Sequence, residues 1–257
     1  MNSSPLSNHV IFITGATSGF GKACAKLLAS YGAKLILTGR RYEKLVELQN
    51  ELGSDRTHIA ELDVTQKDAV QKVIAELPVE FSPITVLINN AGLALGMELA
   101  QNCSIDDWSH VVDTNIKGVL HCTHAILPIM ITNNNGHIIN IGSIAGSYPY
   151  PGGNVYGATK AFVKQFSLNL RADLFGTSIR VTNVEPGLAE TEFSIVRFKG
   201  DMEKAKSLYA GTSPISAEDI AETVFWCLNR PAHININRIE VMPTCQAFGT
   251  FAIDRSN

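Results

Sequence analysis

The fold is decided by the stretch Val10-Ile11-Phe12-Ile13-Thr14-Gly15-Ala16-Thr17-Ser18-Gly19-Phe20-Gly21. Its first four residues are β-branched or aromatic and predict a buried strand that stops at Gly15. Residues 22–31 then have helical periodicity. In this context Gly15 permits a tight turn, Gly19 lets the backbone approach a pyrophosphate, and Gly21 lets the helix pack closely on the strand. The helix N-terminus would face the phosphates. A purely structural turn is the alternative.

The rest of the chain alternates short apolar runs with amphipathic segments. We expect strands at residues 10–13, 34–38, 58–62, 85–88, 138–141, 179–184 and 238–242, and helices at residues 22–31, 42–52, 66–77, 106–130, 154–175 and 218–228. This alternation predicts an α/β protein with a single-domain Rossmann fold, in which helices cover both faces of a doubly wound parallel sheet of about seven strands.

Composition sets limits on the function. The 257 residues are 45% apolar and 18% charged, which is ordinary for a soluble globular protein. The net charge of −3 gives no sign of binding to nucleic acid or to a membrane surface. The five cysteines are scattered without a C-x-x-C pair, so we expect reduced thiols and no metal site. The polar N-terminus is neither a secretory signal nor a membrane span, and we expect a cytoplasmic protein.

The end of the second expected strand bears on the choice of cofactor. An acidic residue at this position binds the ribose 2′-hydroxyl of NAD, whereas an arginine accommodates the 2′-phosphate of NADP. Here Gly39, Arg40 and Arg41 follow the strand, and no carboxylate occurs before Glu43. Permanently charged, planar guanidinium groups suit a phosphate, so the sequence favours NADP as the cofactor. The alternative is that the two arginines lie in a solvated turn and bind no ligand.

Further polar residues follow other strands. Asp63, before Val64, either caps the next helix or contacts the adenine amino group. Asn89-Asn90-Ala91-Gly92 ends the fourth strand, and its small residues let the chain pass close to a ligand. Asn115 lies inside an expected helix, where asparagine is unfavourable, so it has either a polar role or a surface position.

Tyr156 and Lys160 are four residues apart and share one face of an expected helix. A free phenol titrates near pH ~10, and a nearby ammonium favours the phenolate and lowers that pKa. Tyr156 could then exchange a proton with a substrate oxygen, to which Ser143 could donate a hydrogen bond. For such a pair taken alone, the alternative is that the Tyr156 ring packs in the core and the Lys160 ammonium is solvated, with no catalytic role for either.

Together these motifs resemble the short-chain dehydrogenase/reductase family. The matching residues are Thr14-Gly15-x-x-x-Gly19-x-Gly21, Asn89-Asn90-Ala91-Gly92, Asn115, Ser143, Tyr156-x-x-x-Lys160 and Pro186-Gly187-x-x-x-Thr191, in the family's order over nearly the whole chain. The resemblance implies one domain over residues 1–257, with a dinucleotide-binding half near 8–92, a catalytic half over 93–257 and a substrate-covering segment near 187–212.

The resemblance also implies a role for each matching residue. Tyr156 would be the general acid/base, Ser143 would hold the substrate oxygen, and Lys160 would lower the Tyr156 pKa and bind the nicotinamide ribose. Asn115 would help to hold a water that links Lys160 to solvent. NADP-binding residues would be Gly15, Thr17, Ser18, Gly19, Phe20, Gly21, Arg40, Arg41, Asp63, Val64, Asn90, Ala91, Gly92, Tyr156, Lys160, Pro186, Gly187, Leu188 and Thr191.

The second half is most similar to the NADP-dependent 3-hydroxy acid dehydrogenases, through residues 146–163, 185–187, 191–194, 196–200 and 231–237. This implies oxidation of a small 3-hydroxy acid to the 3-oxo acid, and family members are commonly homotetramers. The substrate carboxylate calls for a cation, and Arg197 either binds it or forms a surface or subunit contact.

Two other functions remain open. One is a general carbonyl or 3-oxoacyl reductase, which a large basic patch for a carrier protein would favour. The other is a non-catalytic NADPH-binding protein, which loss of the tyrosine or the lysine would favour.

Overall fold

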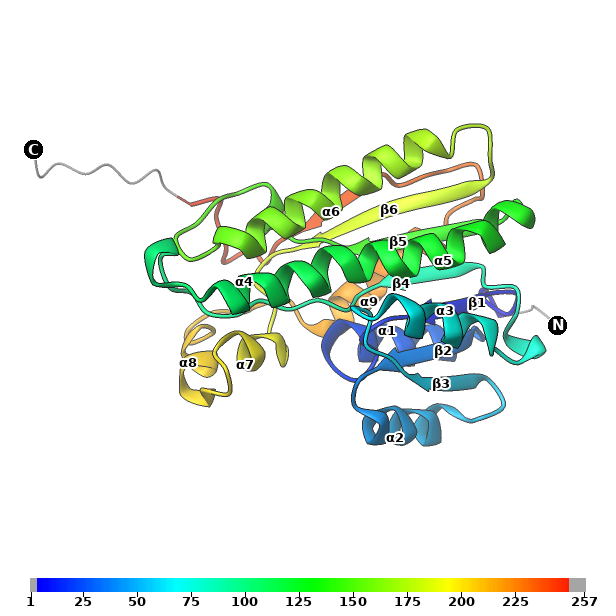
Figure 1. Cartoon of the computed structure of the whole chain (residues 1–257), viewed down its shortest axis with the longest axis horizontal. Coiled ribbons are helices and arrows are strands. Elements are labelled where there is room, and N and C mark those ends of the chain that lie inside the picture. The colour runs from blue at the N-terminus through cyan, green and yellow to red at the C-terminus, as the bar shows by residue number, and fades with distance from the viewer. Residues whose placement is uncertain (1–3, 250–257) are drawn as a thin grey trace, which may run out of the picture.

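A computed structural model describes residues 4–249, which fold around one sheet of parallel strands (Figure 1). The strands lie in the order β3-β2-β1-β4-β5-β6-β7, and every neighbouring pair is parallel. Their bounds are β1 (Val10–Ile13), β2 (Lys34–Gly39), β3 (Thr57–Glu61), β4 (Val86–Asn89), β5 (Gly136–Ile141), β6 (Ile179–Pro186) and β7 (Arg238–Val241). The expected seven-stranded, doubly wound parallel sheet is confirmed.

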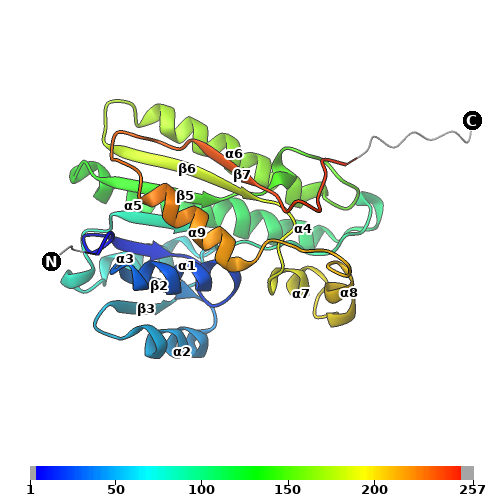
Figure 2. The ribbon, with the colours of Figure 1, turned by 180° about the vertical axis from the view of Figure 1, so that it is seen from behind.

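Helices cover both faces of the sheet. They are α1 (Gly19–Ser30), α2 (Tyr42–Leu52), α3 (Lys67–Ala75), α4 (Ile105–Val112), α5 (Gly118–Thr132), α6 (Asn154–Asp173), α7 (Phe193–Arg197), α8 (Met202–Ser207) and α9 (Ala217–Leu228). Figure 1 shows α4, α5 and α6 in front of the sheet, and Figure 2 shows α1 and α9 on the opposite face.

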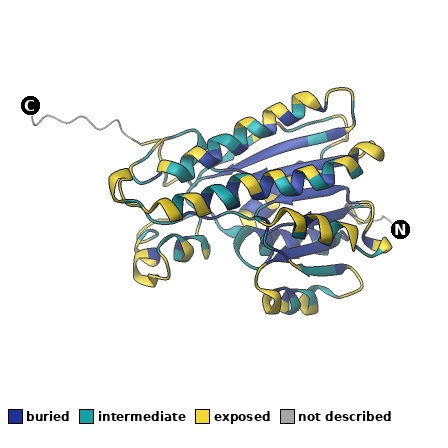
Figure 3. Cartoon of the chain, in the orientation of Figure 1, coloured by how far each residue is buried: buried dark blue, intermediate teal, exposed yellow. Residues whose placement is uncertain are grey.

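The alternation of side chains along each strand divides the core in two. In β1, Ile11 and Ile13 pack into a cluster with residues of α1, α2 and α9, whereas Val10 and Phe12 face a cluster with residues of α3, α5 and α6. Figure 3 shows the strands as a buried layer between helices whose outer faces are exposed. Burial on both faces explains why the strands read as continuous apolar runs in the sequence.

Two helices differ from the expectation in an informative way. Helix α1 begins at Gly19, three residues before the expected start, so Gly19 and Gly21 belong to its first turn. The helix expected over residues 106–130 is interrupted by a π-helical turn (Asp113–Lys117) between α4 and α5. Asn115 lies in this turn, and π-turns of this kind occur often at functional sites.

The strand order determines where a ligand can bind. The chain winds from β1 toward β2 and β3 on one side, and crosses to β4 on the other. In open parallel sheets, ligands bind beyond the carboxyl ends of the strands at such a switch point. Helices α7 and α8 lie together beyond that end of the sheet (Figure 1).

Candidate active site

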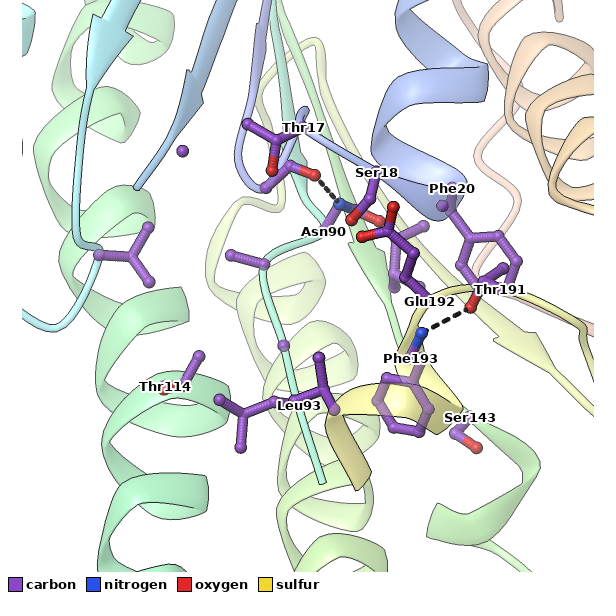
Figure 4. Close-up of a pocket in the computed structure, with 18 of the residues that line it drawn as sticks. Thr17, Ser18, Phe20, Asn90, Leu93, Thr114, Ser143, Thr191, Glu192 and Phe193 are labelled. Carbon is purple, nitrogen blue, oxygen red and sulfur yellow. Dashed lines mark hydrogen bonds between the residues drawn. The ribbon is translucent and has the colours of Figure 1, made fainter. Parts of the chain in front are cut away.

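A cavity of about 400 Å³ opens at the carboxyl ends of the strands, between the glycine turn before α1 and the loop that leads into α7 (Figure 4). It gathers segments that are far apart in the sequence. The residues expected in the site that line it are Gly15, Thr17, Ser18, Gly19, Phe20, Arg40, Arg41, Asp63, Val64, Asn90, Ala91, Gly92, Ser143, Tyr156, Lys160, Pro186, Gly187 and Thr191. The sequence motifs therefore converge on one place.

The glycine turn has a backbone shape that other residues would not readily adopt. Gly15 and Gly19 have φ angles of +66° and +50°, in the left-handed region that favours glycine. A β-carbon at Gly21 would collide with the carbonyl oxygen of Gly15, so this glycine lets α1 pack against the turn. The helix N-terminus and the exposed backbone form a cradle suited to a diphosphate.

Asn90 braces this turn from the end of β4. Its side-chain Nδ2 donates hydrogen bonds to the carbonyl oxygens of Thr14 (2.9 Å) and Gly15 (3.0 Å). The hydroxyl of Thr14 in return accepts hydrogen bonds from the backbone N–H groups of Asn90 and Ala91. The Asn90 amide is therefore engaged with the protein backbone, a positioning role that the motif alone did not reveal.

The end of β2 carries cations and no acid. Gly39 and Arg40 line the cavity, and a β-carbon at Gly39 would contact the Thr17 side chain. The Arg41 guanidinium donates to the Thr17 hydroxyl from Nε (3.2 Å) and Nη2 (3.0 Å), and it forms an ion pair with Glu192 at 2.9 Å. Arg41 thus joins the dinucleotide-binding half to the loop before α7.

Asp63 holds the backbone after β3. Its Oδ1 accepts hydrogen bonds from the Thr65 backbone N–H (2.9 Å) and from the Thr65 hydroxyl (2.8 Å). Asp63 therefore does not cap the next helix, as the sequence analysis had allowed: α3 begins at Lys67 with Gln66 in the cap position, and Asp63 stabilises the turn that precedes it. Asp63 also lines the cavity, where a contact with the adenine amino group remains a prediction.

Tyr156 and Lys160 lie one helical turn apart on α6, and both face the cavity. The Lys160 Nζ is 5.9 Å from the centre of the Tyr156 ring and donates a 2.7 Å hydrogen bond to the Ile141 carbonyl oxygen. Lys160 is 7% exposed, and burial lowers its pKa to about 8.

A second cation lies nearer to the tyrosine. The Arg197 guanidinium is 5.0 Å from the centre of the Tyr156 ring and 5.1 Å from that of Phe193. Burial raises the pKa of Tyr156, while the Arg197 charge and a hydrogen bond from Ser143 act in the opposite direction. The sequence had assigned a lowering of this pKa to Lys160, whereas in the structure the net shift is upward and the cation that opposes it is Arg197.

The Arg197 guanidinium has an N–H group that donates no hydrogen bond within the described residues. Its Nη2 donates to the Tyr150 hydroxyl at 3.2 Å, and its buried Nε has no hydrogen-bond partner among residues 4–249. An unpaired buried donor on a cation is costly, so such groups commonly mark a binding position. The neighbouring Lys199 is instead paired with Asp107 of α4 at 2.6 Å and anchors this segment.

Asn115 is buried and fully engaged. Its side chain accepts from the Leu93 N–H (2.9 Å) and donates to the Leu93 carbonyl oxygen (2.9 Å) and to the Thr159 hydroxyl (3.0 Å). Thr159 immediately precedes Lys160. A β-carbon on Gly92 would lie 3.3 Å from the Asn115 oxygen and 3.5 Å from the Lys160 Nζ, so both side chains border this glycine.

Some expected residues lie outside the cavity lining, and others were missed. Gly21, Asn115, Leu188 and Arg197 do not line it, although Gly21, Asn115 and Arg197 contact residues that do. The sequence did not single out Tyr150, Glu192 and Phe193. Phe193 packs on Tyr156, with ring centres 5.6 Å apart. Its place two residues after Thr191 was the available signal.

Two further properties bear on the chemistry. Within residues 4–249, His, Cys, Asp and Glu side chains do not gather in the groups of three that would hold a metal ion. Over the same range, a helix with both the length and the apolar character needed to cross a membrane is absent.

Comparisons with known proteins agree with this geometry. The family model described as short chain dehydrogenase matches residues 9–201. The chain is 53% identical to the NADP-dependent 3-hydroxy acid dehydrogenase of Escherichia coli (strain K12) and 54% identical to sulfoacetaldehyde reductase 2 of Chromohalobacter salexigens. Each comparison covers 96% of this chain and 99% of the relative. A closed form of serine dehydrogenase with NADP+ superposes with a TM-score of 0.94 at 53% identity, over 96% of this chain and 99% of that one.

Proposed function

The chain belongs to the short-chain dehydrogenase family, and from this premise we propose that it is an NADP-dependent oxidoreductase that interconverts a small 3-hydroxy acid and the corresponding 3-oxo acid. The observation that carries the choice of substrate is the position of Arg197 over the ring of Tyr156, at 5.0 Å. A cation beside the proton-transfer group is what an anionic substrate requires.

The residues of the cavity fit NADP. The glycine turn offers a cradle whose packing against α1 a β-carbon at Gly21 would disrupt. Gly39 replaces the acid that would favour NAD, and Arg40 and Arg41 supply positive charge for a 2′-phosphate. When bound, the nicotinamide would donate or accept the hydride.

The protein's own part is to move a proton and to orient the substrate. Ser143 would hold the substrate oxygen next to Tyr156, whose phenolate would take a proton from the alcohol in oxidation and whose hydroxyl would return one to the carbonyl oxygen in reduction. Arg197 favours the phenolate through its positive charge, and Lys160 lies 5.9 Å from the centre of the same ring. Asn115 acts as a positioning residue, because it ties Leu93 to Thr159 beside Lys160.

Arg197 would bind the substrate carboxylate. Its buried Nε is without a partner among the described residues, and Tyr150 fixes the other side of the guanidinium at 3.2 Å. A carboxylate that pairs with Arg197 would be held close to Tyr156, so its 3-hydroxyl would reach the acid/base group within the span of a three-carbon chain.

The test compares 3-hydroxypropionate with 3-hydroxypropionamide, which differ in charge and little in shape. We expect the unmodified protein to prefer the acid by about 10- to 100-fold in kcat/KM, as for a charged hydrogen bond. Arg197→Ala should remove this preference by raising the KM for the acid. Lys206→Ala, which removes an exposed cation from the same covering segment, is the matched control. An unchanged KM for the acid in Arg197→Ala would reject the assignment.

A second candidate is the reduction of a small sulfonated aldehyde. It is favoured because a guanidinium pairs with a sulfonate as well as with a carboxylate, and because a relative with 54% identity is a sulfoacetaldehyde reductase. Measuring kcat/KM for sulfoacetaldehyde beside that for malonic semialdehyde decides between the two. The larger value identifies the preferred anion.

We also propose that the protein works as a homotetramer in the cytoplasm. Exposed apolar residues on α5, α6 and α9, namely Leu120, Leu168 and Trp226, support an assembly through these helices. Sedimentation at micromolar concentration tests the proposal, and a monomer would reject it.

A further inference from the structure

Arg41 already has an anionic partner within the protein. Its Nη1 pairs with the Glu192 carboxylate at 2.9 Å, while Nε and Nη2 are bound to the Thr17 hydroxyl. All three guanidinium nitrogens are therefore engaged. Arg40, which precedes it, takes part in no ion pair among residues 4–249.

Glu192 reaches Arg41 from the other half of the chain. It lies immediately before α7 and lines the same cavity as Thr17 and Arg41. Figure 4 shows its carboxylate extended toward Thr17 and Ser18 of the glycine turn. The carboxylate thus lies on Arg41, one of the cations proposed to meet the 2′-phosphate.

We infer that Glu192 is a determinant of cofactor selectivity, acting as an internal counter-ion of Arg41 that a ribose 2′-phosphate displaces and a 2′-hydroxyl does not. The inference rests on the proposed use of NADP. It assigns a role to a residue for which the sequence analysis proposed none.

The physical reason is charge. A phosphate and a carboxylate that share one guanidinium leave an excess of negative charge, so the carboxylate must move or lose its hydrogen bond. A neutral 2′-hydroxyl cannot compete with a carboxylate for Arg41, and it leaves the pair intact. Glu192 therefore weakens the binding of NADP without weakening that of NAD.

The same contact links the cofactor to the covering segment. Glu192 precedes α7, and Arg197 is the last residue of that helix. Displacement of the carboxylate by a 2′-phosphate frees the start of α7 from Arg41. Binding of a 2′-phosphate at the adenosine end of the cavity would therefore affect α7, the helix that carries Arg197.

The experiment measures the dissociation constants of NADP, NAD and 2′,5′-ADP by titration calorimetry with the unmodified protein and with Glu192→Gln. The substitution keeps the shape and removes the charge. Because the pair is half exposed, we expect NADP and 2′,5′-ADP to bind about two- to fivefold more tightly, and NAD to bind as before. Glu190→Gln, an exposed carboxylate on the same loop, is the matched control and should change neither affinity.

A double variant tests whether the effect of Glu192 depends on Arg41. In an Arg41→Gln background, Glu192→Gln should no longer affect NADP binding, because the charge it competes for is gone. Equal shifts for NADP and NAD, weaker NADP binding, or no shift would overturn the inference alone. Failure of the unmodified protein to bind NADP would overturn the proposed function and this inference together.

Discussion

The guanidinium of Arg197 lies 5.0 Å from the centre of the Tyr156 ring, although 41 positions separate the two residues in the sequence. Arg197 ends α7, and Tyr156 lies near the start of α6. The contact gives one residue two effects on the reaction. It would attract an anionic substrate, and its charge favours the phenolate of Tyr156.

Removal of Arg197 should therefore change the pH dependence even for a substrate without charge. Its charge acts to lower the Tyr156 pKa against the effect of burial, so Arg197→Ala should raise that pKa. For the oxidation of a neutral alcohol, which needs the phenolate, the rise of kcat with pH should move to higher pH. Profiles of kcat against pH for the unmodified protein and for Arg197→Ala check this, with Lys206→Ala as control. Superimposable profiles would contradict it.

Asn115 is predicted to matter for stability as well as for activity. Asn115→Ala would leave the N–H and carbonyl groups of Leu93 without their partner in a buried position. We expect the free energy of unfolding to fall by about 2–4 kcal/mol, as measured by urea denaturation. Asn50→Ala, at an exposed position within α2, is the control. An equal loss in both variants would mean that the Leu93 contacts do not stabilise the fold.

Most of the fold was predictable because local signals and the tertiary structure agree. Strands buried on both faces read as apolar runs, and glycine at φ angles of +66° and +50° marks the turn before α1. The interruption between α4 and α5 was not predictable, because the contacts of its Asn115 side chain with Leu93 span 22 positions and leave no local signal in the sequence.

The site was predictable only where a residue belongs to a motif. Ser143, Tyr156 and Lys160 have spacings that imply their chemistry. The partners that act through distant contacts carry no such signal. Glu192 meets Arg41 across 151 positions and Tyr150 meets Arg197 across 47, so only the folded chain brings them together.

The buried His137 should make stability depend on pH. Burial holds its pKa well below 6.5, and the charges of Arg180 and His9 act in the same direction. The unfolded chain binds a proton below about pH 6.5 and the folded chain does not, so the free energy of unfolding should fall as the pH drops from there, by up to ~1.4 kcal/mol per pH unit.

Urea denaturation between pH 7 and pH 5.5 measures this slope. His137→Gln should flatten it, and the exposed His124→Gln should not. Part of the slope should persist, because burial also lowers the pKa of His9 and of His58. A slope that His137→Gln leaves unchanged would show that His137 is not the group responsible.

The measurement that tests the central claim most directly follows the absorbance of the reduced nicotinamide with NADP or NAD and a panel of L-serine, L-allo-threonine, 3-hydroxybutyrate and 3-hydroxypropionate. We predict turnover with NADP that falls by at least about 10²-fold in Tyr156→Phe, while NADP still binds and the exposed Tyr42→Phe remains active. Turnover of neutral ketones but of none of these acids, or an active Tyr156→Phe, would contradict it.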